Sequence, residues 1–513
     1  MTSPFQKKSG MKTSQLFSSG CALALGALLS GCMPGPKYQK PSAPVATAPV
    51  YKESTANFQD ADGWKVANPQ DAMLRGKWWE IFQQPELNEL EDQLDVNNQN
   101  IKVSFENLIA ARAEVREAKA QYWPTITTSP SWSRTKTSGN LGKSSTANGG
   151  STTSNWSFPF DVSWTPDFFG KIRNEVREAQ YAAQVSAADL ENERLIEQAT
   201  LAETYFEIRG QDALQKVLDD TVVADKKSLD LTKAQFDTGV GDYIAVVQAE
   251  TTLKSAESTA LNLGVARAQF EHAIAMLIGK PATDYSIPVR PLLVAPPPIP
   301  VGVPSLLLQR RPDIAAAERT VAEANATIGI GYGAFFPDVT LSASGGFEAS
   351  AFKHWFDWPS RMWSIGPSVS QTIFNGGLYR AELQQFTAAY NGDVATYRQT
   401  VLTAFQQVED FLAATRILSQ QVLKQQEAVD AAQKALDLEM GRYQTGIDPY
   451  IDVVTQQTTL LTEQQSLATL QVEESTAAVE LVQALGGGWD SSQLPTPAQV
   501  SGKLDKSVTT LQR

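Results

Sequence analysis

The chain contains two copies of one unit, and this duplication limits its possible folds more than any other feature. Residues 229–253 and 436–460 align without a gap at an offset of 207, and 12 of the 25 aligned positions are identical. The same offset pairs Trp156 with Trp363. Upstream the offset becomes 213, so the first copy carries six extra residues in a Gly/Ser/Thr-rich loop between about 134 and 155. A length of 513 residues alone would suggest about three domains, whereas the repeat predicts two equivalent units.

Each unit contains a pair of stretches in which apolar and polar residues alternate, at about 124–165 and about 337–373. Alternation over ~10 residues is typical of a tilted strand that crosses a bilayer, with its apolar side toward lipid and its polar side toward the lumen. A soluble β-sandwich with one wet face is the alternative. Aromatic residues cluster in these stretches, as they do at the interfaces of membrane barrels: Trp132, Trp156, Trp164, Phe347 and Trp363.

Between the strand pairs lie long stretches without proline, at 167–280 and 368–448. Their apolar residues recur at spacings of four and three, which predicts helices in coiled-coil-like contact. A helix over about 170–238 would be roughly 100 Å long. Its return over about 242–278 reaches roughly 55 Å, and a helix over about 97–122 adds roughly 39 Å. Each unit is therefore expected to be a long hairpin in which one side is continuous and the other is made of two stacked pieces.

Four strands in one chain cannot close a barrel, because about eight is the smallest useful number. Open sheet edges are not tolerated in lipid, so the chain must oligomerise. Three copies would give 12 strands above a ring of long hairpins. The expected fold is a mixed α/β membrane protein: a trimeric 12-stranded β-barrel, with four strands per chain, continued by a long α-helical barrel and built from two internal repeats.

The first residues form a targeting signal. Three lysines precede an apolar run over residues 16–29, which is too short for a membrane-spanning helix. The run ends in Leu-Ser-Gly-Cys at 29–32, which resembles the lipobox of bacterial lipoproteins and would make Cys32 the lipid-bearing first residue of the mature protein. An ordinary signal that ends in cysteine by chance is the alternative. Met33, in place of an aspartate, favours the outer membrane, and the Pro/Ala-rich segment that follows predicts an extended tether.

Composition excludes several other classes of function. The formal net charge of -13 argues against nucleic-acid binding, which needs a basic surface. A zinc site of His and Cys ligands is close to excluded, because the chain has only His272, His354, Cys21 and Cys32. No nucleophile–base pair, phosphate loop or metal-ligand motif occurs in the sequence, so neither an enzyme nor a cofactor other than the lipid is expected.

These features together resemble the TolC-like outer-membrane efflux proteins, in the lipoprotein branch of the OprM and NodT type. The resemblance extends from about residue 78 to about 488 and rests on the lipobox, the Trp-Pro and Phe-Pro strand starts, the duplicated Thr-Gly turn and the segment Arg310-Arg311-Pro312-Asp313-Ile314. It implies a homotrimeric exit duct in the cell outer membrane that extends into the periplasm. Such a duct passes drugs or other small molecules and works with a periplasmic adaptor and an inner-membrane transporter, most often of the RND type.

The resemblance also assigns roles to the two hairpin turns. Tyr443, Asp448 and Asp452 match or adjoin the residues that close the periplasmic end in this family, where a ring of aspartates would bind cations. The alternative is that both aspartates only begin and cap a helix. Six turn residues correspond to the family's adaptor contacts: Thr238, Gly239, Val240, Thr445, Gly446 and Ile447. The alternative is that each glycine only ends a helix.

The expected organisation runs in six parts: a signal peptide (1–31), a lipid-anchored tether (32–60), a first repeat (61–280) with its turn near 239, a Pro-rich linker (281–305), a second repeat (306–488) with its turn near 446, and a tail (489–513). The linker, the tail and residues 60–94 are expected to surround the tube at its middle. The segment at 310–313 is expected to start the second repeat and to be structural. Two alternatives remain: the exit duct of a type I protein secretion system, and a coiled-coil surface lipoprotein with a scaffolding role.

Overall fold

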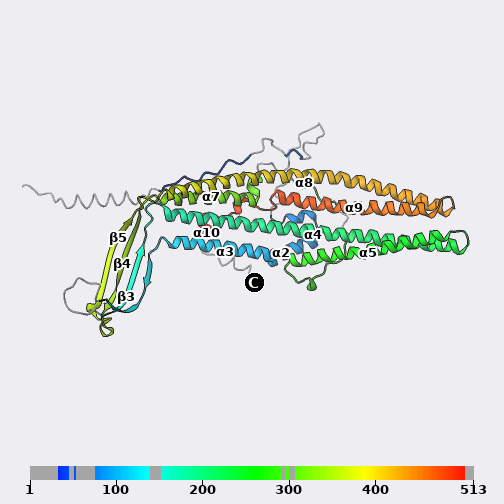
Figure 1. The fold of residues 1–513 in the computed structure, drawn as a ribbon. Helices are drawn as coiled ribbons and strands as arrows, with labels where there is room; N and C mark the ends of the chain where they lie inside the picture. Colours follow the sequence, from blue (N-terminus) through cyan, green and yellow to red (C-terminus); the bar gives the residue numbers. More distant parts are fainter. Residues whose placement is uncertain are drawn as a thin grey trace, which may run out of the picture.

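The computed structural model describes residues 33–44, 51–53, 76–138, 152–291, 295–299 and 307–502. A long body of helices carries a narrow antiparallel sheet at one end, and the two helical hairpin turns lie together at the opposite end (Figure 1). The predicted signal peptide and Cys32 lie outside the described residues.

The predicted duplication is confirmed by helices of identical length in the two copies. The longest are 67 residues, about 100 Å at 1.5 Å per residue. The six matched helices are α3 (Gln99–Ala120) with α7 (Pro312–Gly333), 22 residues each; α4 (Lys171–Asp237) with α8 (Leu378–Gln444), 67 each; and α5 (Tyr243–Leu277) with α9 (Tyr450–Ala484), 35 each.

The shorter side of each hairpin is made of two helices that meet end to end. In the first copy Asn98 links them, because its side-chain oxygen accepts the backbone N–H groups of Asn100 and Ile101 at the start of α3. Its amide donates to the carbonyl of Leu277 at the end of α5, at 3.0 Å. One side chain thus satisfies free backbone groups at two helix ends.

Arg311 makes the equivalent link in the second copy. Its guanidinium donates to the carbonyl of Ala484 at the end of α9, at 3.0 Å, and pairs with Asp313 in the first turn of α7. The carboxylate of Asp313 in turn accepts the N–H of Ile314, and Pro312 occupies the first position of the helix, where no N–H is needed. The segment at 310–313 is therefore structural, as predicted.

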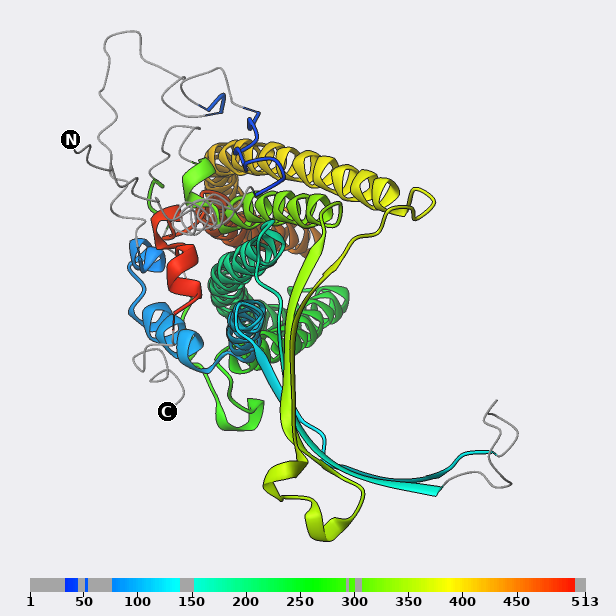
Figure 2. The same ribbon diagram turned by 90° about the vertical axis from the view of Figure 1, so that its left-hand side faces the viewer.

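Helix α4 lies at the centre of the chain, between the α3/α5 column and the α7/α9 column, and α8 lies at the far edge (Figure 2). Of the 67 residues in each long helix, 26 are buried in α4 but only 8 in α8. The same length of helix is therefore covered on several sides in one copy and left largely uncovered in the other, as expected where a neighbouring subunit must complete the contact.

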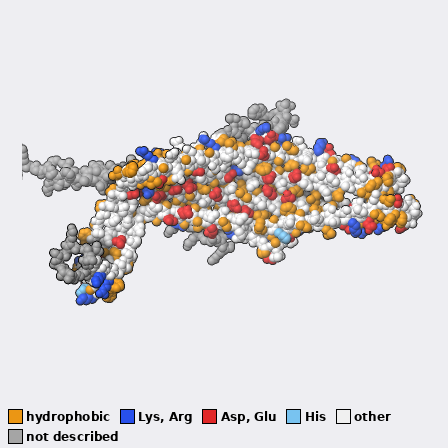
Figure 3. Space-filling view, in the orientation of Figure 1, with side chains coloured by type: hydrophobic (Ala, Val, Ile, Leu, Met, Phe, Trp, Pro, Cys, Tyr) orange, Lys and Arg blue, Asp and Glu red, His pale blue; other side chains and the backbone are white. Residues whose placement is uncertain are grey.

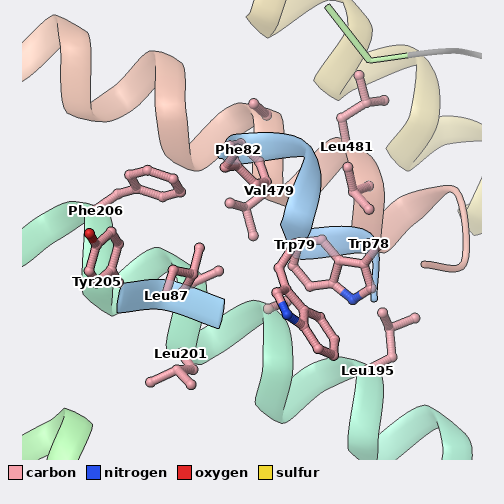
Figure 4. Packing of buried hydrophobic residues seen from close by; sticks show 14 of the residues in the cluster. Trp78, Trp79, Phe82, Leu87, Leu195, Leu201, Tyr205, Phe206, Val479 and Leu481 are labelled. Atoms are coloured by element: carbon pink, nitrogen blue, oxygen red, sulfur yellow. The ribbon is translucent and has the colours of Figure 1, made fainter. Parts of the chain in front are cut away.

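A large hydrophobic core lies near mid-length of the helical body (Figure 1), and Figure 4 shows part of its packing from close by. A short 3-10 helix, η3 (Trp78–Phe82), and helix α2 (Pro85–Asn97) place Trp78, Phe82 and Leu87 against the aromatic pair Tyr205 and Phe206 of α4 and against α9. This part of the expected equatorial segment thus joins the two repeats. The C-terminal helix α10 (Pro497–Val500) packs on α4 nearer to the sheet.

The sheet has five strands where four were predicted: β1 (Thr125–Thr128), β2 (Ser131–Lys136), β3 (Thr152–Trp164), β4 (Asp338–Ala349) and β5 (Arg361–Ser370). Both β1 and β2 pair with β3 and occupy one strand position. They are separate because Pro130 lies between them and Pro159 lies opposite, and neither proline can donate to the ladder. The number of strand positions is therefore four.

The register of the sheet gathers the alternating residues onto two faces. Val162 pairs with Ala343, which pairs with Ile365, and this row extends through the other apolar positions of β3, β4 and β5. On the opposite face Asp161 pairs with Ser344, which pairs with Ser364. One side of the sheet is thus apolar and the other polar, as the alternation predicts.

The described residues of the predicted N-terminal tether lie against the helices and form a strap along them. The hydroxyl of Tyr38 donates to Glu318 on α7, and Arg398 of α8 donates to the backbone of Ser42. Further along, Arg416 of α8 pairs with Glu53 at 2.7 Å. A Pro/Ala-rich composition predicts extension, which is observed, but it does not predict these side-chain contacts.

We expect Gly486→Ala to destabilise the assembled protein by about 1–3 kcal/mol. Gly486 follows α9 with φ +94, and a Cβ there would lie 2.3 Å from the carbonyl oxygen of Arg310. The matched control is Gly392→Ala in the interior of α8, where no atom of the same chain lies within 4 Å of an added Cβ, and alanine favours helix. Thermal unfolding of the purified protein should show a lower midpoint for the first variant alone, and equal midpoints would contradict the steric argument.

Candidate functional site

The two hairpin turns have the same backbone geometry. Each long helix is followed by a threonine whose hydroxyl donates to a carbonyl in the last helical turn, and a glycine with positive φ comes next: Gly239 at +77 and Gly446 at +76. The next residue closes the turn by donating its N–H to a carbonyl five residues back, from Val240 at 2.9 Å and from Ile447 at 3.0 Å. The glycines therefore end the helices, as the simpler interpretation held.

The turns also present apolar side chains to solvent. Val240 is 83 % exposed and Ile447 65 %, and both lie at the end of the helical body farthest from the sheet. Beside them Ile244 and Ile451 are exposed on the first turns of α5 and α9. Exposed apolar groups gathered on one end indicate a surface that contacts a partner.

Of the three predicted gate residues, Asp448 is held within its own turn. Arg442 forms a bidentate pair with it, and this guanidinium lowers the pKa of the Asp448 carboxyl. Asp452 lies at the third position of α9 and is exposed. The two aspartates therefore have different surroundings, and Asp452 is the one that presents its charge to solvent.

Tyr443 lies between the two hairpins. It is 9 % exposed, its ring is 5.2 Å from that of Tyr450, and its hydroxyl donates to the side-chain oxygen of Gln235 on α4. The structure thus brings together the ends of α4, α8 and α9 around this tyrosine. The contribution of Gln235 was missed, and nothing in the repeat could reveal it, because the bond joins positions that are not repeat equivalents.

A second polar contact between the hairpins lies farther from the turns. Gln457 on α9 donates to the hydroxyl of Ser228 on α4 at 3.1 Å. Asp225, one turn away on α4, is 2 % exposed, and desolvation raises the pKa of its carboxyl to about 6. The two hairpins are therefore joined by polar contacts at Tyr443 and at Gln457, set among apolar side chains.

The predicted interfacial aromatics fall at both ends of the apolar face. Trp132 pairs with Trp156 at the end far from the helices, and Phe347 and Trp363 lie close to that end. Trp164 lies at the helical end, where its indole N–H donates to the carbonyl of Tyr122 at 2.9 Å. Trp164 lies eight positions after Trp156, which corresponds to about 26 Å along the strand and is close to the height of the apolar band of a membrane barrel.

Met33, the neighbour of the predicted lipid-bearing cysteine, lies at this same helical end. A Cβ on Gly170, at the start of α4, would lie 2.5 Å from the Met33 side chain, and Arg177 donates to the Met33 sulfur at 3.1 Å. Met33, the first described residue, therefore lies at the junction between the sheet and the helices, where one membrane leaflet would lie.

Within the described ranges, no group of three or more His, Cys, Asp or Glu side chains could hold a metal ion. None of the helices in that part of the chain carries an apolar stretch sufficient to cross a bilayer.

Comparison with known proteins agrees with this geometry. The model of the outer membrane efflux protein family matches residues 90–280 and 303–487, one match in each repeat. The chain is 32% identical over 465 residues to the probable efflux pump outer membrane protein TtgC of Pseudomonas putida, which covers 90% of this chain and 94% of that protein. It is 29% identical over 466 residues to the cation efflux system protein CusC of Escherichia coli, covering 90% and 96%.

The solved structure of the outer-membrane channel OprN superimposes with a TM-score of 0.78 at 26% identity, covering 89% of this chain and all of that one. The scaffolding-lipoprotein alternative is therefore wrong, because a coiled-coil scaffold has no need of the membrane sheet. The chain belongs to the outer membrane efflux protein family, has the fold of the trimeric TolC-like channels and is the outer-membrane component of an efflux system.

Proposed function

We propose that three copies of this chain form a passive duct for small molecules and perform no chemistry. The observation that carries the proposal is the separation of the two faces of the sheet. A row such as Asp161, Ser344 and Ser364 would line a water-filled lumen, while Val162, Ala343 and Ile365 on the other face would contact lipid. The sparse burial of α8 supports closure of the helices into a tube by the neighbouring subunits.

The periplasmic end of the tube would close by contacts at the hairpin turns. Tyr443 and Gln235 hold the two hairpins of one chain together, so breaking this bond would favour their separation. Asp452, exposed on the first turn of α9, would contribute one negative charge per chain to the constriction and favour cations. Asp448, neutralised by Arg442, would instead keep the turn rigid.

The apolar turn residues would bind a periplasmic adaptor that links the duct to an inner-membrane transporter of the RND class. Their exposure supports this role, because Val240 and Ile447 lie beyond the last helical turns and most of each side chain is left uncovered by the described residues of its own chain. An adaptor that inserts apolar side chains between the turns would also compete with the contacts that hold the hairpins closed. Docking and opening would then be one event.

The position of Met33 supports a lipid on Cys32. An acyl group on the preceding residue would enter the periplasmic leaflet of the outer membrane beside the helical end of the sheet. The anchor would therefore lie at the depth that the barrel itself requires.

Single-channel recordings in planar bilayers test the gate. Tyr443→Phe removes a hydrogen bond worth about 0.5–1.5 kcal/mol, so the open probability should rise several-fold. Asp452→Ala should lower the preference for cations while the channel still opens. Tyr243→Phe is the matched control, because Tyr243 is the repeat equivalent of Tyr450 and is 60 % exposed. If the Tyr443→Phe and Asp452→Ala channels both behaved as wild type does, Tyr443 and Asp452 would not form the gate.

Drug accumulation in cells that lack the chromosomal copy of the gene tests the adaptor contact. Val240→Asp with Ile447→Asp should abolish efflux, because charges would replace the apolar contact, while trimer assembly and conductance stay at wild-type levels. Val103→Asp, on the exposed face of α3, is the control and should preserve efflux. Full efflux by the double variant would contradict docking at the turns.

Metabolic labelling with radioactive palmitate tests the anchor. Wild-type protein should incorporate the label, and Cys32→Ser should incorporate none. Cys21→Ser is the control, because Cys21 would leave with the signal peptide. Labelling that survives Cys32→Ser would place the lipid elsewhere or reject the lipobox.

A further inference from the structure

The end of the sheet far from the helices carries a connected cluster of aromatic rings. The ring of Trp156 lies 5.4 Å from Trp132 and 5.2 Å from Trp355. Trp355 stacks on Phe356 at 4.9 Å, and Phe356 reaches Phe347 at 5.6 Å. These rings come from β2, β3, β4 and the segment between β4 and β5, so residues 350–360 are fixed to the sheet by aromatic contacts.

The segment at 350–360 folds onto the apolar face of the sheet. Trp156 and Phe347 both belong to that face, and their partners in the segment cover its outer end. The segment nevertheless presents apolar groups outward, since Phe352 is 65 % exposed, Phe356 60 % and Trp358 71 %. An element that is apolar on both sides at the rim of a lipid-facing surface fits the interface between hydrocarbon and headgroups.

Basic side chains surround this cluster. Arg134 and Lys136 follow Trp132 on the same face of β2, about 7 Å and 13 Å farther out along the strand, and both are exposed. Lys353 is exposed in the loop segment, and the guanidinium of Arg361 lies 3.2 Å from the centroid of the Trp358 ring. A group of Lys, Arg and His side chains is visible at this tip of the molecule (Figure 3). We call these four Lys and Arg residues and the rings beside them the aromatic–basic rim.

Acidic residues are scarce around the rim although the whole chain is acidic. The sequence contains no Asp or Glu from residue 118 to 160, within a chain of net charge -13. Asp357 is the single acid between residues 349 and 381, and its carboxylate contacts His354 at 2.6 Å. Glu348 belongs to the polar face, where Asn155 donates to it at 2.7 Å. The rim therefore keeps a positive charge.

We propose that the aromatic–basic rim binds the phosphate groups of an anionic lipid in the outer leaflet of the outer membrane. The headgroup region begins within several ångströms of the hydrocarbon boundary, where Arg134 and Lys136 lie relative to the aromatic belt. Cations at that depth attract anionic headgroups, and exposed rings pack against the adjoining acyl chains. The inference rests on the sheet lying in the outer membrane as a barrel, and three copies would form a continuous lipid-binding ring around it.

The test measures binding of bisphosphorylated lipid A to the purified trimer by native mass spectrometry. The variant Arg134→Gln/Lys136→Gln/Lys353→Gln should lower the affinity about fivefold for each charge removed, so about a hundredfold in total. Arg361 is left unchanged because it supports Trp358. The control Lys102→Gln/Lys226→Gln/Lys227→Gln removes three exposed charges from the helices and should bind as wild type does.

A second measurement uses the wild-type protein alone, so its result does not depend on how the variant folds. Lipid A stripped of its phosphates should bind at least tenfold more weakly than the bisphosphorylated form, and added salt should weaken only the latter. Equal binding of both forms, or wild-type affinity in the rim variant, would overturn the proposal. Conductance recorded on the same samples separates this result from the duct itself, since a rim variant that conducts normally but loses lipid A affects only the rim.

Discussion

Backbone groups that lie in lipid must all be hydrogen-bonded within the protein, and the architecture of this chain follows from that requirement. One chain supplies four strand positions, so β1 and β2 at one edge and β5 at the other have free N–H and C=O groups. Only copies of the same sheet can pair both edges at once. The helices below the membrane also need neighbouring subunits. Helix α8 lies at one edge of the chain, and few of its residues are buried by their own chain. Both the β-barrel and the helical tube are thus closed by contacts between copies of the chain.

The sequence predicts most of this fold because the fold is periodic. Period-two alternation, proline-free helical stretches and a fixed offset are properties of many residues at once, and the helix ends fall within a few residues of where the pattern places them. Individual side-chain contacts, by contrast, cannot be predicted from these sequence patterns. The bond between Tyr443 and Gln235 joins residues 208 positions apart that no pattern relates. The break between β1 and β2 depends on two prolines, Pro130 and Pro159, that fall at the same gap in the pairing only once the register is set.

The two repeats have diverged where they meet the rest of the chain. Arg209 and Arg416 are equivalent by the offset of 207. In the first repeat Arg209 is fully buried and pairs with Asp212 and Glu86, which connects α4 to the equatorial segment. In the second repeat Arg416 pairs with Glu53 of the N-terminal strap. The two equivalent arginines thus bind different segments: Arg209 binds the equatorial segment and Arg416 binds the N-terminal strap.

The maximum length of the N-terminal strap is close to the distance between its two contacts on the helices. Met33 contacts the start of α4, and Glu53 contacts Arg416, which lies 39 residues into α8 from Gly377, or about 58 Å along the helix. Glu53 lies 20 positions after Met33, and a chain of that length can extend over at most about 70 Å. The strap therefore has little slack. A lipid fixed to its first residue would tie the depth of the membrane surface to the midpoint of the tube, and shortening the strap by a few residues would force one of its two ends to detach.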